Sequence, residues 1–190
     1  MVKLDKIYTR GGDHGETSLG DGVRVPKSSA RISALGEVDE ANAAIGLARL
    51  GADGPTDAIL AHIQNDLFDL GADLCMPIRE SDRPALRLMQ SQIDWLEQRI
   101  DALTARLSPL TSFVLPTGNA LAARLHFART VVRRAERAVV HLLEAPDEAV
   151  NRLVLIYLNR LSDLLFVLAR AANGNGSADV LWVPAGSRNG

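Results

Sequence analysis

The chemically most unusual stretch of the sequence lies near its start. It combines glycines, carboxylates, hydroxyls and a guanidinium with almost no hydrophobic side chain: Thr9, Arg10, Gly11, Gly12, Asp13, His14, Gly15, Glu16, Thr17 and Ser18. Glycine lets the backbone adopt positive φ and approach a ligand closely. Successive exposed N–H groups then form a concavity that attracts anions. The stretch is therefore either a phosphate-binding loop or a plain surface turn, and it matches neither the P-loop nor the G-x-G-x-x-G motif.

A row of arginines is the second candidate for chemistry. Arg129, Arg133 and Arg137 are four residues apart, so in a helix they share one side. Glu136 offsets only part of their charge, and the ordinary interpretation is a solvated basic face. Arginine rather than lysine stands at every position, however, and its planar fork suits bidentate recognition of phosphate or carboxylate. If this face meets the N-terminal loop, an oligophosphate could lie between them.

Two further features have open interpretations. Asn159, Ser162 and Asp163 form a polar seam in an otherwise apolar segment. Buried polar groups need partners, so the seam is either a structural hydrogen-bond network or a ligand contact. Phe113 lies in a proline-containing loop. It either fills a local gap or acts as a wedge against a flat ligand.

The sequence also contains an acidic patch, four histidines and one cysteine, which are the residue types that could bind a metal ion. Glu37, Asp39 and Glu40 are an ordinary solvated patch, and they are also the nearest partners for the surplus arginines. The four histidines show no Glu-x-x-His pairing, which argues against a di-metal carboxylate site. The lone Cys75 excludes an internal disulfide framework and a multi-thiolate zinc site. We therefore expect no metal site built by protein ligands.

Composition narrows the class of protein further. The chain has 190 residues and a net charge of −2, so no basic field favours nucleic acid or an anionic membrane surface. Aromatic residues make up only 4%, which argues against a stacking platform for single strands. Charged residues interrupt the N-terminus, and no stretch approaches the ~20 apolar residues of a membrane span. We expect a cytoplasmic protein without nucleic-acid or membrane partners.

Apolar periodicity predicts the elements that must position these groups. Five segments repeat apolar residues at alternating steps of three and four, within residues 30–50, 60–74, 93–107, 121–142 and 150–171. With no convincing alternating strand, they predict an all-α five-helix bundle in a single domain. Ser28 or Ser29 is the expected N-cap of the first helix. The fifth segment is apolar on nearly all sides and should be central, and the patch 180–183 should hold the glycine-rich tail 173–190 against the bundle.

Six blocks in one order carry a family resemblance. They are Tyr8–Asp13 with Gly15 and Thr17, Arg24–Lys27, Gly36–Glu40, Phe113–Pro116, Arg133–Arg137 and Tyr157–Asp163. In these blocks the chain resembles the PduO-type ATP:cob(I)alamin adenosyltransferases, and the blocks are spread over nearly the whole chain. Relatives often have Pro-Gly-Gly where this sequence has Pro116-Thr117-Gly118, which changes the freedom of the Phe113 loop.

The resemblance implies where ATP binds. The family is a five-helix bundle that assembles as a homotrimer with active sites between subunits. Residues 1–28 would be the ATP-binding loop and residues 29–172 the bundle. Mg²⁺ would accompany ATP. The implied ATP contacts are Thr9, Arg10, Gly11, Gly12, Asp13, Gly15, Thr17, Ser18, Lys27, Arg133, Arg134, Glu136, Arg137 and Asn159. Relatives vary at the Gly11 position, so it carries no specific chemical role.

The resemblance also implies a reaction. Cob(I)alamin attacks the 5′-carbon of ATP, and triphosphate leaves. Arg129 is similar to the residue that pairs with an aspartate, here Asp39, across the subunit boundary. Phe113 is similar to the aromatic residue that occupies the lower face of the corrin and displaces its dimethylbenzimidazole base. With Arg133 and Glu136, these residues form the implied catalytic group. A reductase and an adenosylcobalamin-dependent client enzyme are implied partners. The alternatives are an ATP- or cobalamin-binding carrier or sensor, and a purely structural bundle.

Overall fold

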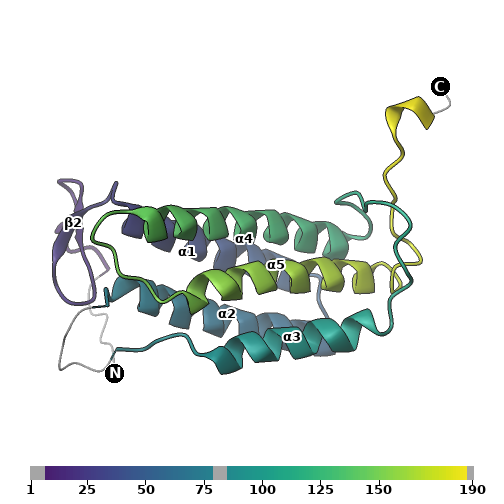
Figure 1. Ribbon diagram of the computed structural model, residues 1–190, viewed down its shortest axis with the longest axis horizontal. Coiled ribbons are helices and arrows are strands. Elements are labelled where there is room, and N and C mark those ends of the chain that lie inside the picture. Colours follow the sequence, from purple (N-terminus) through teal and green to yellow (C-terminus); the bar gives the residue numbers. More distant parts are fainter. Residues whose placement is uncertain (1–6, 79–84, 188–190) are drawn as a thin grey trace.

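Five long helices lie side by side in the computed structural model, which describes residues 7–78 and 85–187 (Figure 1). They are α1 Ala30–Arg49, α2 Gly54–Cys75, α3 Gln90–Thr104, α4 Ala120–Glu144 and α5 Leu153–Ala172, with a short 3-10 turn at Ala185–Ser187. The predicted helical bundle is confirmed. Pro84, expected to bound the third helix, falls outside the described residues, as do the ends of the expected N-terminal loop and C-terminal tail. Among the described helices, none is long and apolar enough to cross a membrane.

A small antiparallel hairpin, which the sequence pattern did not predict, precedes α1. β1 Glu16–Ser18 pairs with β2 Arg24–Pro26, and Thr17 lies opposite Val25. Each strand has only three residues. That is too short for an alternation of apolar and polar residues to stand out. The hairpin ends three residues before the Ser29 N-cap, whose side chain accepts from the Ile32 N–H and starts α1 as predicted.

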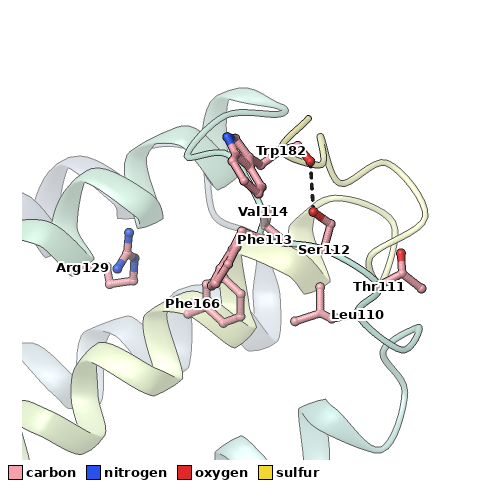
Figure 2. Close-up of a pocket in the computed structure, with 8 residues that line it drawn as sticks. All are labelled: Leu110, Thr111, Ser112, Phe113, Val114, Arg129, Phe166 and Trp182. Carbon is pink, nitrogen blue, oxygen red and sulfur yellow. Dashed lines mark hydrogen bonds between the residues drawn. The ribbon is translucent and has the colours of Figure 1, made fainter. Parts of the chain in front are cut away.

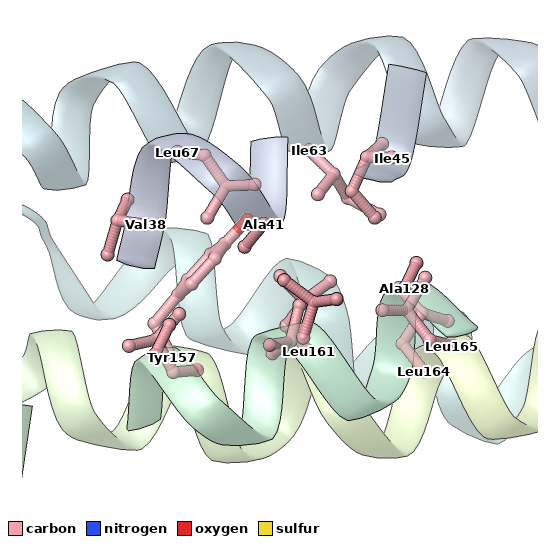
Figure 3. Close-up of a cluster of buried hydrophobic side chains, with 14 of the residues drawn as sticks. Val38, Ala41, Ile45, Ile63, Leu67, Ala128, Tyr157, Leu161, Leu164 and Leu165 are labelled. Carbon is pink, nitrogen blue, oxygen red and sulfur yellow. The ribbon is translucent and has the colours of Figure 1, made fainter. Parts of the chain in front are cut away.

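Helix α5 is buried along most of its surface, as its apolar sequence predicts. It packs against α3 and α4, and α1 packs against α2 and α4. Figure 3 shows Tyr157 and Leu161 of α5 facing Val38 and Ala41 of α1 and Leu67 of α2. Ile156 remains partly exposed, so one edge of α5 is uncovered in the single chain. The buried Tyr157 hydroxyl donates to Asp66, and burial together with Asp66 and Asp69 raises its pKa well above the usual value.

The two ends of the bundle are closed by different segments. At one end, Gly20 N–H donates to the Cys75 carbonyl and so joins the hairpin to the end of α2. Arg31 is buried there and donates to Glu148 and to the Leu74 carbonyl. At the other end, the Ser108 N–H donates to the Asn175 carbonyl, which joins the loop after α3 to the tail. The hairpin and the loop before α4 therefore lie at opposite ends (Figure 1).

His126 is a buried polar residue of α4 that gives a pH-dependent stability. It is 1% exposed, its ring meets Phe166 edge to face, and neither ring nitrogen has a hydrogen-bond partner within residues 7–78 and 85–187. Burial, and then the nearby Arg129 charge, lower the pKa of His126, while Asp179 opposes them. In the unfolded chain His126 is therefore protonated as the pH falls through 6.5, whereas in the folded chain it stays neutral to a lower pH.

We predict that the free energy of unfolding falls as the pH drops through 6.5, and that His126→Leu removes this contribution. Urea unfolding of both proteins between pH 8 and pH 5.5 measures it. At pH 8 the two should differ little in their pH dependence, because His126 is neutral in both states. Parallel stability curves below pH 6.5 would show that His126 is not the titrating group.

Candidate active site

The N-terminal glycine-rich loop is folded onto the hairpin. Gly15 N–H donates to the Gly12 carbonyl, and the Gly15 carbonyl accepts from Lys27 N–H at 2.8 Å. Gly15 has φ +82°. Arg10 has φ 61°, a backbone conformation that residues other than glycine rarely adopt. Most side chains of the loop are exposed. The loop is therefore a turn closed by backbone hydrogen bonds, with its polar groups facing outward.

Two cationic side chains lie against this loop: Arg24 of β2 and Lys27, which directly follows β2. A Cβ atom at Gly12 would lie 2.9 Å from Lys27 Nζ, so Lys27 rests directly on the glycine. Arg24 donates to the Gly11 carbonyl at 2.6 Å and to Ser18 Oγ at 3.3 Å. Our residue-by-residue prediction included Lys27 and omitted Arg24. The signal was present, since Arg24 and Lys27 belong to one sequence block. Arg24 and Lys27 thus add cationic donors to a loop that also carries Asp13 and Glu16, and Arg24 lies 3.8 Å from the Glu16 carboxylate.

The arginine row on α4 is confirmed as a row and is left without carboxylates. Among the described residues, none of Arg129, Arg133 and Arg137 forms an ion pair, and Arg137 donates to the Arg133 carbonyl. Arg129 is partly buried, and its Nε atom has no hydrogen-bond partner among the described residues. Burial, and then the Arg133 charge, lower the Arg129 pKa. Arg133 and Arg137 are exposed, so their guanidiniums are accessible to solvent or to an external anion.

Arg134 differs from its neighbours because the acidic patch of α1 already holds it. It donates to Glu37 at 2.5 Å and pairs with Glu40. The hydrogen bonds that Arg134 donates to Glu40 and Glu37 raise its pKa. The expectation that the acidic patch supplies partners to the arginines is confirmed for this residue. Asp39 lies between them in sequence, is exposed, and has no ion-pair partner among the described residues.

Glu136 and Asn159 lie beside the arginine row. Asn159 Nδ2 donates to Glu136 Oε1 at 3.0 Å, across the contact between α4 and α5. Glu136 follows Arg133 by three residues, so the two share a helix face. Asn159 also accepts weakly from Arg160 at 3.4 Å. The polar seam thus contains a hydrogen-bond network, and that network is part of the same surface as Arg133.

A pocket of about 710 Å³ opens beside the loop before α4 (Figure 2). It is lined by Leu110, Thr111, Ser112, Phe113, Val114, Arg129, Phe166 and Trp182. Phe113 is 80% exposed. A phenylalanine that filled a local gap would be buried, so that interpretation is wrong. Trp182 meets Phe113 edge to face, with ring centroids 6.1 Å apart. Phe166 and Trp182 were not predicted, because only the fold brings them to Phe113.

The described chain does not bring the two halves of the predicted site together. The glycine-rich loop lies at the hairpin end, and Phe113 lies at the opposite end (Figure 1). Helix α4, which runs between them, has 25 residues and spans roughly 37 Å. Arg129 lines the same pocket as Phe113, and Arg133, Glu136 and Asn159 lie farther toward the hairpin end. No group of three or more His, Cys, Asp or Glu side chains that could hold a metal ion occurs in the described residues.

Comparisons with known proteins agree on one family. The family model for cobalamin adenosyltransferase matches residues 7–172. The corrinoid adenosyltransferase of Mycobacterium tuberculosis is 55% identical over 190 residues, which cover 98% of this chain and 97% of that protein. The corrinoid adenosyltransferase of Bacillus subtilis is 44% identical over 181 residues, which cover 92% of this chain and 91% of that one.

Solved structures give the same result at the level of the fold. A variant of the PduO-type ATP:corrinoid adenosyltransferase from Lactobacillus reuteri, complexed with cobalamin and ATP, superposes with a TM-score of 0.86. It is 39% identical, and the match covers 93% of this chain and 99% of that chain. The matched sequence includes the glycine-rich loop, the arginine row and the Phe113 loop, so the chain belongs to the cobalamin adenosyltransferase family.

Proposed function

We propose that this protein transfers the 5′-deoxyadenosyl group of ATP to the cobalt of cob(I)alamin, giving adenosylcobalamin and triphosphate. The observation that carries the proposal is the exposed Phe113 ring on an open pocket that also contains Arg129 of the unneutralised arginine row. An aromatic wedge suits a flat corrin, and arginines suit a polyphosphate. The Lactobacillus reuteri relative, complexed with cobalamin and ATP, supports both ligands.

The substrate supplies the nucleophile in this reaction. The Co(I) electron pair attacks the 5′-carbon, a cobalt–carbon bond forms, and the carbon–oxygen bond breaks with its electrons leaving on triphosphate. This differs from phosphoryl transfer, in which phosphorus is attacked. The protein must hold the 5′-carbon over cobalt, and such positioning can lower the barrier by roughly 7–11 kcal/mol. The chemistry belongs to the cobalt, and the chain supplies orientation and electrostatics.

Stabilisation of the leaving triphosphate is the task of the positive groups. The amides of residues 9–18, together with Lys27 and Arg24, form one positive surface, and Arg133 and Arg137 form the other. Fixed donors aimed at developing charge are the usual source of such stabilisation. Mg²⁺ would be carried by the triphosphate oxygens and a few loop groups rather than by a protein cage, because it retains several of its waters.

The distance between these surfaces supports active sites shared between subunits, and the family resemblance implies that the assembly is a homotrimer. The glycine-rich loop and Phe113 are separated by the length of α4, so one chain cannot present both to the same substrates. The exposed Asp39 and the unpaired Arg129 are suited to pair between subunits. Asp39 also lines an apolar groove with Leu35 and the exposed Phe68, which suits contact with another copy.

Phe113 would also promote formation of the nucleophile. Reduction of Co(II) is difficult while an axial ligand is bound. An apolar ring under the corrin excludes the base and water, which leaves four-coordinate Co(II) that is easier to reduce. The 80% exposure of Phe113 fits this role, because the ring is displayed toward the pocket rather than packed away. A physiological reductase would then supply the one electron that converts Co(II) to Co(I), and Co(I) would attack the 5′-carbon.

The activity itself is tested under strict anaerobiosis with ATP and chemically reduced cobalamin. We expect formation of a cobalt–carbon bond, seen by absorbance, with one triphosphate released for each product. Release of ADP and phosphate would contradict attack at the 5′-carbon. Tight binding of both substrates without a spectral change would identify a carrier instead.

The wedge is tested with Phe113→Ala. Adenosylation from Co(II) plus reductant should fall at least tenfold more than adenosylation from pre-formed Co(I), since only the first route needs four-coordinate Co(II); tenfold corresponds to ~1.4 kcal/mol. Phe127→Ala is the matched control, because Phe127 is an exposed phenylalanine of α4 outside the pocket. It should leave the ratio of the two rates unchanged. Equal losses on both routes for Phe113→Ala would remove it from this role.

The subunit contact is tested by exchanging its charges. Arg129→Asp and Asp39→Arg should each weaken the trimer about tenfold or more, because like charges would then face each other across the boundary. The double variant should regain trimer formation, measured by sedimentation velocity. Asp101→Arg, an exposed aspartate of α3, serves as the control for charge reversal alone. Failure of the double variant to recover beyond either single variant would refute the pairing.

A further inference from the structure

The chain reverses direction sharply after α5. Gly174, Asn175 and Gly176 follow one another with φ values of 63°, 53° and 91°. Glycine and asparagine are the residues that tolerate this left-handed conformation best. The Gly176 N–H donates to the Arg170 carbonyl at 2.9 Å and so fixes the turn to the last turn of α5. The following residues 177–183, which we call the strap, run back toward the Phe113 loop.

The strap holds the backbone of the Phe113 loop directly. Trp182 N–H donates to the Phe113 carbonyl at 2.7 Å, and Leu115 N–H donates to the Val180 carbonyl at 2.8 Å. Ser112 Oγ donates to the Trp182 carbonyl at 2.9 Å, as Figure 2 shows. These bonds place the Trp182 ring against the edge of Phe113. The position of Phe113 therefore depends on the position of the strap.

Burial of apolar side chains contributes little to holding the strap. Trp182 is 41% exposed, and Val180 and Leu181 are exposed to a similar degree. Hydrophobic stabilisation scales with the apolar area removed from water, so these residues obtain only part of it. The strap needs another anchor.

That anchor is a buried ion pair between Arg170 and Asp179. Arg170 Nε donates to Asp179 Oδ2 at 2.7 Å, and the two side chains are 6% and 3% exposed. Arg170 Nη2 also donates to the Ser108 carbonyl at 2.7 Å, and Asn173 Nδ2 reaches Asp179 Oδ1 at 3.4 Å. Removing one partner of a buried pair leaves the other charge uncompensated, which is strongly unfavourable. Arg170 thus joins α5, the strap and the loop after α3.

We infer that the Arg170–Asp179 pair is a latch that positions the Phe113–Trp182 aromatic pair for the cobalamin half of the reaction. Both latch residues are buried and neither lines the pocket, so they act through Phe113 and are positioning residues. The catalytic part of this inference rests on the proposed function of Phe113. Loss of the latch frees the strap, and Phe113 loses both its backbone hydrogen bond and its ring contact.

The position of the strap can be read independently of activity. The chain has two tryptophans, Trp95 and Trp182, so Trp95→Phe leaves Trp182 as the only indole. In that background, Asp179→Asn should shift the emission to longer wavelength and increase quenching by acrylamide. Glu148→Gln breaks the buried Arg31 pair at the opposite end of the bundle and is the matched control. It should lower the melting temperature and leave Trp182 emission unchanged.

The effect on the reaction is measured as the ratio of adenosylation rates from Co(II) plus reductant and from pre-formed Co(I). Asp179→Asn and Arg170→Met should lower this ratio roughly tenfold, in the direction of Phe113→Ala. Arg170→Lys keeps the buried charge and should retain most of both the ratio and the emission, which a general loss of stability would not produce. Glu148→Gln should leave the ratio at the wild-type value.

Each result decides the inference. Unchanged Trp182 emission in Asp179→Asn overturns the latch. Shifted emission with a wild-type rate ratio, while Phe113→Ala lowers the ratio, overturns its positioning role. If Phe113→Ala itself leaves the ratio unchanged, the proposed wedge fails and the positioning role fails with it. The Trp182 emission measurement then distinguishes a failure of the proposed wedge from a failure of the latch to hold the strap.

Discussion

Surplus positive charge on α4 is the constraint on which the rest of this molecule depends. The chain can pair its arginines when structure requires it, since Arg31, Arg134 and Arg170 all have carboxylate partners. The row Arg129, Arg133 and Arg137 has none among the described residues. Like charges four residues apart on a helix repel one another mildly, and a bound anion offsets that repulsion. In the proposed function, the triphosphate of ATP and the carboxylate of another subunit would supply this negative charge.

The direction of α4 then sets the order of chemistry along the molecule. Arg129 adjoins the aromatic pocket, and Arg133 and Arg137 lie successively closer to the hairpin end. A substrate lying along this face meets an apolar wedge first and positive charge next. In the proposed function, that order would suit a corrin with the adenosyl group above it and a triphosphate extending away. Helix α4 would then fix the distance between the bond-forming and charge-stabilising parts of the site.

Much of this arrangement could be predicted from the sequence because it is local. Apolar steps of three and four predict the five helices, and Ser29 marks the start of α1. Arginines four residues apart share a helix face whatever the fold is. The hairpin was not predicted because a three-residue strand is too short for an alternation of apolar and polar residues to be recognised. The surroundings of Phe113 were not predicted because Phe166, Arg170 and Trp182 are more than fifty residues away in sequence. Their positions near the Phe113 loop depend on how α5 ends and on a left-handed turn, and the spacing of apolar residues predicts neither.

The strap also has a consequence for the order in which the protein is made. It follows α5 in the sequence, so a chain emerging from the ribosome can complete its helical core before it can pin Phe113. The bundle core does not include the strap. A chain that stops after α5 would keep the apolar core and lose Asp179, so Arg170 would be buried without its partner. Such a chain would lose stability at this end of the bundle together with the contacts that fix Phe113.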